Sequence, residues 1–172
     1  PDGAETFGIW VYPVGEHPGL ILTVRIKDGE GLYSDYELGM PTTEKWHYLE
    51  SDLVKPISHG VPHSPLRLQS IYARIKSVEG GHEHPTAIYL DNLQVSGSSL
   101  PAVILEDFED AFDWGTMPTE MATGRRGRGR AVGDFFSRAW TEVHDGEASG
   151  KFSWRAASDF GYRGVFPNLD EK

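Results

Sequence analysis

The chain has 172 residues, a formal net charge of −10 and no cysteine. This length suits one domain with its own core, and the lack of cysteine excludes a disulfide scaffold. Five Trp, seven Tyr and eight Phe are spread along the chain, which excludes a disordered acidic tail, and 20 Gly with 11 Pro favour turns over long helices. No apolar run approaches the roughly 20 residues that a membrane-spanning helix needs.

Apolar and polar residues alternate with a period of two along most of the chain, as where Val24 and Ile26 alternate with Arg25. This is the pattern of a half-buried strand. In chain order it predicts strands at 7–14, 20–27, 44–49, 70–76, 87–95, 103–108, 140–143, 151–157 and 161–166. Because no helical stripe with caps is present, the sequence predicts an all-β fold, a β-sandwich or jelly roll of about nine antiparallel strands.

One predicted strand changes phase at residues 91–92. Ile88 and Leu90 precede the change, and Leu93 follows it out of step. A slip of this kind predicts a β-bulge, and bulges re-aim side chains beside sites. Asp91 is therefore a candidate ligand, and the alternative is an edge carboxylate that faces water.

The segment at 96–101 has the Ser, Gly and Pro content of a flexible linker. It divides the chain into residues 1–97 and 98–172. Neither part reads as a closed sandwich, so we expect both to contribute strands to a single domain over 1–172.

Aromatic-rich motifs occur in both parts of the chain. They are Phe7–Tyr12, Lys45–Leu49, Leu68–Tyr72 and Ala87–Leu93 in the first part, and Leu105–Asp110, Trp114 and Asp145–Trp154 in the second. The first set resembles the second half of the galactose-binding-like jelly-roll carbohydrate-binding modules of bacterial glycanases and surface proteins, and the second set resembles the first half. The halves thus stand in reversed order. A circular permutant, or the tail of one tandem module followed by the head of the next, would explain this, and a domain-swapped dimer would satisfy the same pattern.

The resemblance implies an extracellular or cell-surface protein that binds polysaccharide and is not an enzyme. It also implies a structural calcium ion, which needs six to eight oxygen ligands. The positions that match the calcium ligands of the family are Asp107, Glu109, Glu147, Lys151 through its carbonyl, and Asp91. The alternative is that these acidic residues are simply solvated.

Five side chains are candidates for contact with a sugar. Trp10 and Tyr12 share one side of a strand, while Arg25, Tyr72 and Arg74 point away from the aliphatic residues of theirs. Aromatic rings can stack on the C–H face of a pyranose, and the guanidinium groups can donate to its hydroxyls. If these strand faces lie on one concave sheet, they form a glycan platform; otherwise Trp10 packs in the core, where Trp46 is also expected.

Other functions have weaker support. The Arg-Gly run at 123–130 is either a surface loop or a contact for an acidic polymer, and the remaining negative charge argues against nucleic acid. His82 and His84 lack the rest of a metal motif. No nucleophile elbow, phosphate loop or zinc-protease motif occurs. The alternatives to glycan binding are a structural or protein-interaction sandwich and a small glycanase or lyase.

Overall fold

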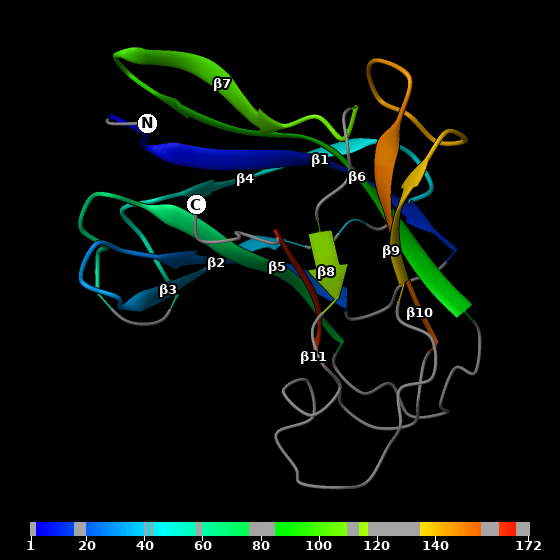
Figure 1. Ribbon diagram of the computed structural model, residues 1–172, viewed down its shortest axis with the longest axis horizontal. Coiled ribbons are helices and arrows are strands. Elements are labelled where there is room, and N and C mark those ends of the chain that lie inside the picture. The colour runs from blue at the N-terminus through cyan, green and yellow to red at the C-terminus, as the bar shows by residue number, and fades with distance from the viewer. Residues whose placement is uncertain are drawn as a thin grey trace, which may run out of the picture.

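A computed structural model shows an antiparallel β-sandwich (Figure 1). It describes residues 3–15, 20–39, 41, 43–57, 60–75, 85–109, 114–116, 135–155 and 162–167, with only the backbone at 20, 73–75, 85–86, 114–116, 135, 154–155 and 162–167. Eleven strands form two sheets in this part of the chain, which contains no helix. The all-β prediction is therefore confirmed.

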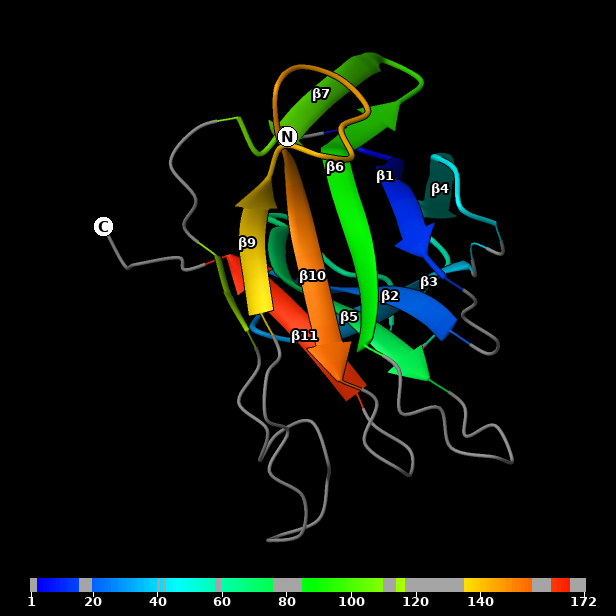
Figure 2. The same ribbon diagram turned by 90° about the vertical axis from the view of Figure 1, so that its right-hand side faces the viewer.

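The first sheet has six strands, and five of them lie side by side in the order β4-β1-β6-β10-β9 (Figure 2). They are β1 (Thr6–Val14), β4 (His47–Asp52), β6 (Pro85–Gly97), β9 (Phe135–Ala139) and β10 (Ser149–Arg155), while the sixth, β7 (Leu100–Glu106), pairs with β6. The second sheet has the order β3-β2-β5-β11-β8. Its strands are β2 (Leu20–Lys27), β3 (Tyr33–Gly39), β5 (Arg67–Ile75), β8 (Trp114–Thr116) and β11 (Tyr162–Pro167).

The hydrophobic core lies between the sheets and follows the predicted alternation. Ile9 and Val11 of β1 face Val24 of β2 and Ile71 of β5 in one buried cluster. Burying each such aliphatic side chain contributes roughly 1.5–3 kcal/mol. Because these residues point inward, the residues between them in sequence project from the outer face of each sheet.

Strand β6 changes neighbours at the predicted bulge. Residues 85–90 pair with β10, and residues 93–97 pair with β7. The register against β1 shifts between Gly8 and Trp10, and Asn92 adopts a φ of 44°. The bulge is therefore confirmed, and it marks where one partner of β6 replaces the other.

Residues 96–101 form a tight hairpin and not the flexible linker that their composition predicts. Gly97 pairs with Leu100, and Ser98 donates its backbone N–H to the carboxylate of Glu5 at 3.1 Å. Strands from both sides of this hairpin pair in each sheet, as β6 does with β10 and β5 with β11.

Three described strands, β3, β8 and β9, have no counterpart among the predicted ones. In β3 the residues that face the core are Ser34, Tyr36 and Leu38. Because Ser34 is polar, the strand shows only a short apolar alternation. The strand predicted at 140–143 is wrong, since these residues lie in the loop that follows β9. No helix in the described residues is long and apolar enough to cross a membrane.

Candidate functional site: an aromatic face on the first sheet

Six rings gather on the outer face of the first sheet, and we call this surface the aromatic platform. It consists of Trp10 and Tyr12 of β1, Trp46 just before β4, Tyr48 of β4, Tyr89 of β6, and His144 from the loop between β9 and β10. Five of the rings are partly exposed, and Tyr89 is buried among them. Trp10, Tyr12, Tyr48 and Tyr89 stand outside the core because they alternate with inward-facing residues of their strands.

Tyr48 is positioned by a glycine. Trp10 and Tyr48 are cross-strand partners with ring centroids 5.4 Å apart. A Cβ built on Gly8 would lie 2.9 Å from Cε2 of the Tyr48 ring, so this ring covers the place where a larger residue would project. Its hydroxyl accepts a hydrogen bond from the Gln94 amide at 2.8 Å. The ring thus bridges the three strands β4, β1 and β6.

Tyr12 lies at the other end of the platform. Its ring is 5.7 Å from Trp46 and 6.2 Å from Tyr89, both in tilted or edge contact. Burial raises the pKa of Tyr12, and the carboxylates of Glu142 and Glu44 add to the increase. This end therefore combines aromatic surface with negative charge.

The loop between β9 and β10, seen in orange in Figure 2, brings His144 onto the platform. The imidazole stacks on Trp10 with centroids 3.7 Å apart and planes 20° apart, and its edge faces Trp46 at 5.6 Å. One face of Trp10 is therefore covered by the protein itself. Trp140, in the same loop, is 68% exposed, and the Arg138 guanidinium lies 5.7 Å from its ring.

Asp91 holds this loop from the bulge in β6. Its side chain is fully buried and accepts the backbone N–H groups of His144 at 3.0 Å, Asp145 at 3.3 Å and Asn92 at 2.7 Å. Burial raises the pKa of Asp91, and these three donors act against the increase. The idea that Asp91 is an edge carboxylate facing water is thus wrong.

Glu109 holds the same loop from the other side. One of its carboxylate oxygens accepts the N–H groups of Glu147 at 2.7 Å and Ala148 at 2.9 Å. Gly146 has a φ of +77°, and a Cβ there would meet this carboxylate, so the turn requires glycine. Two carboxylates therefore hold residues 144–148 of the loop by accepting their backbone N–H groups.

The predicted calcium ligands are only partly brought together. Asp91 and Glu109 meet loop 144–148, and Asp107 accepts the N–H of Glu109 at 3.1 Å. Lys151 pairs on both sides of β10, with Tyr89 and Ser137, which commits its backbone groups to the sheet. Its ammonium lies 5.2 Å from the Tyr89 ring.

In this structure, backbone N–H donors occupy two of the predicted calcium ligands. The described residues contain no group of three or more His, Asp or Glu that could hold a metal ion. The carboxylates of Asp91 and Glu109 face N–H donors, which a cation would have to displace. Calcium stays a prediction that rests on the resemblance alone.

The five predicted sugar-binding residues do not share one face. Trp10 and Tyr12 lie on the outer face of the first sheet, whereas Arg25 and Tyr72 lie on the outer face of the second, 5.5 Å from guanidinium carbon to ring centroid. The expectation of a single concave platform is therefore wrong, because the core separates the two groups. The side chain of Arg74 lies outside the described part of the structure.

Sequence reasoning missed four members of the platform. Trp46 was expected in the core, and Tyr48, Tyr89 and His144 were not singled out. The available signal was phase, since Tyr89 alternates with the core residues Ile88 and Leu90. His144 carried no such signal because a loop places it. The Arg-Gly run and the two histidines at 82 and 84 lie outside the described residues.

Comparison with known proteins adds no assignment. No protein-family model matches the chain, and no curated protein or solved structure shows significant similarity to it.

Proposed function

We propose that this protein binds a polysaccharide without cleaving it, through the aromatic platform of the first sheet. The observation that carries the proposal is the position of these rings outside the core, where Trp10, Tyr12 and Trp46 are partly exposed on a rigid sheet. Rings held in this way offer flat apolar surface to the C–H faces of sugars.

Polar groups at the edges of the platform suit sugar hydroxyls. The Gln94 amide and the Tyr48 hydroxyl lie at one end, and the hydroxyls of Tyr89 and Thr141, 3.2 Å apart, lie nearer the loop. These groups can exchange hydrogen bonds with a ligand at little cost in conformational entropy, because the strands already hold most of them in place.

The carboxylates at the Tyr12 end of the platform favour a neutral glycan there, while the Lys151 ammonium lies over the neighbouring Tyr89 ring at 5.2 Å. Glu44 and Glu142 lie close enough to Tyr12 to raise its pKa, so a uronate at this end would be repelled. Together with the resemblance to carbohydrate-binding modules, this supports a role in holding an attached enzyme or a cell surface against a neutral polysaccharide outside the cell. A structural calcium ion is part of this proposal and is tested separately.

Affinity electrophoresis tests the proposal in gels that contain soluble β-glucan, xylan, mannan or xyloglucan. We expect retardation in at least one gel and its loss in Tyr12→Ala. Tyr33→Ala, which removes a partly exposed tyrosine on the other sheet, is the matched control and should migrate like the parent protein. Uniform mobility in every gel would overturn the proposal and favour a structural or protein-interaction sandwich. Release of reducing sugar would favour an enzyme.

A further inference from the structure

We propose that the outer face of the second sheet is a separate binding surface and that it takes an acidic polysaccharide bearing uronate carboxylates. The surface, here called the cationic face, is formed by Arg25 and Lys27 of β2, Tyr33 of β3 and Arg67 of β5. It differs from the aromatic platform in position and in charge, so it can be tested independently.

An exposed ring lies between two of the cations. Tyr33 is 41% exposed, with the guanidinium carbon of Arg25 at 5.9 Å and the ammonium of Lys27 at 5.7 Å from its centroid. Cation–π contacts of this kind help to hold the long side chains of Arg25 and Lys27 beside the exposed ring. An anionic sugar needs both elements, an aromatic surface for its ring and a cation for its carboxylate.

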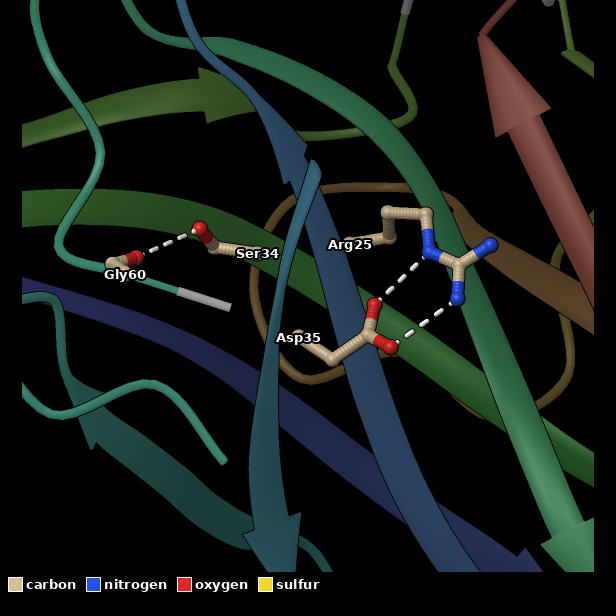
Figure 3. A network of polar contacts seen from close by, with 4 residues as sticks. All are labelled: Arg25, Ser34, Asp35 and Gly60. Carbon is tan, nitrogen blue, oxygen red and sulfur yellow. Dashed lines mark hydrogen bonds and ion pairs between the residues drawn. The ribbon is translucent and has the colours of Figure 1, made fainter. Parts of the chain in front are cut away.

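Arg25 is fixed by an ion pair but retains free donors. Its Nε and Nη2 donate to the two carboxylate oxygens of Asp35 at 2.7 and 2.9 Å. Figure 3 shows this bidentate contact across β2 and β3, with Ser34 turned to the opposite side toward Gly60. A guanidinium has five N–H donors, and Asp35 accepts two of them while the Tyr72 hydroxyl is a further hydrogen-bond partner, which leaves two for a ligand. The side chain of Arg25 is 35% exposed.

Lys27 and Arg67 carry two further positive charges on this face. They are cross-strand partners and therefore share one face of the sheet. Among the described residues neither forms an ion pair. Glu37 also projects from β3 on this side, but it pairs with a residue four positions from Lys27 along β2, which is about 13 Å away.

The local charge contrasts with that of the whole protein. The chain carries a formal net charge of −10, which repels acidic polymers at long range. At physiological salt this repulsion is screened beyond about 8 Å, so the cations of this face act on a carboxylate that reaches them. Because the core separates the two faces, one molecule could bridge a neutral and an acidic polysaccharide.

The test measures how much of the full chain is removed from solution by agarose beads that carry polygalacturonate. Beads without polygalacturonate are the blank. We expect binding that is lost as NaCl is raised, and a Kd about threefold higher for Lys27→Ala. Lys55→Ala removes the same charge from an exposed lysine paired with Asp52 and should bind like the parent protein. Tyr12→Ala should also bind normally.

Two outcomes would overturn the proposal: no depletion at low salt, or equal weakening by Lys27→Ala and Lys55→Ala. The second outcome would mean that only the overall charge matters. Binding by the aromatic platform is measured separately, with neutral polysaccharides and Tyr12→Ala. Failure of one proposal can therefore be told apart from failure of the other.

Discussion

The buried carboxylate of Asp91 accepts the backbone N–H of His144 at 3.0 Å, although 53 residues separate them. Asp91 occupies the bulge at which β6 exchanges β10 for β7, and His144 stacks on Trp10. A local irregularity in one strand therefore determines where a distant loop places a ring on the aromatic platform.

Replacing Asp91 with asparagine should destabilise the protein. An amide has only one acceptor oxygen, so its NH₂ group would face an N–H of His144 or Asn92. Leaving a buried donor unpaired costs about 1–3 kcal/mol in the free energy of unfolding, which urea unfolding can measure. Asp107→Asn, at an exposed position, is the control and should change stability by less. Equal losses in both variants would contradict the role given to Asp91.

Gly8→Ala should disturb the platform without affecting the core. The new Cβ would overlap the Tyr48 ring and force it away from its hydrogen bond with Gln94. We expect weaker binding to any glycan that retards the parent protein in affinity gels. Gly60→Ala, where a Cβ meets nothing within 4 Å, should bind normally. Unchanged binding by Gly8→Ala would place the ligand away from Tyr48.

His144→Ala should open one face of Trp10 to solvent, since the imidazole now covers it at 3.7 Å. Acrylamide should then quench tryptophan fluorescence more strongly than in the parent protein. His63→Ala, at an exposed histidine in the turn beside Asp28, should leave quenching unchanged. Identical quenching in the two variants would show that the loop does not shield Trp10 in solution.

The resemblance predicts that a chelator lowers the unfolding temperature by several degrees and that added calcium restores it. The reason is that an ion bound only by the folded state stabilises that state. Differential scanning fluorimetry with EDTA or calcium measures this. Magnesium is the control and should not restore the temperature. An unchanged temperature with EDTA would show that Asp91 and Glu109 hold the loop through backbone N–H groups alone.

Asp28 should contribute stability that depends on pH. Burial acts to raise its pKa, but the backbone N–H groups of Leu32, His63 and Glu30 outweigh burial and lower the pKa below 3.8. The folded state therefore favours the ionised form, and its contribution is complete above pH 3.8 and lost as the pH falls through the lowered value.

The comparison with Asp28→Asn measures this effect. The difference in unfolding free energy between the parent protein and Asp28→Asn should be constant near neutral pH and shrink below pH 3.8. A difference that grows on acidification would have the wrong sign and would contradict the assignment.

Strand positions were predictable wherever apolar residues alternate along several positions. The strand predicted at 20–27 matches β2, and the phase slip at residues 91–92 identified the bulge. Prediction failed in β3, where the polar Ser34 is one of the buried residues, and at 140–143, where a short alternation of apolar and polar residues lies in a loop.

The sequence by itself determined the sandwich class and which residues of each strand share a side, because alternation is a local property of an extended chain. Only the tertiary structure decided that Trp10 and Arg25 lie on opposite faces, since strand order depends on pairing between distant segments. It also decided that His144 joins the platform, because contacts with Asp91 and Trp10 place that loop residue.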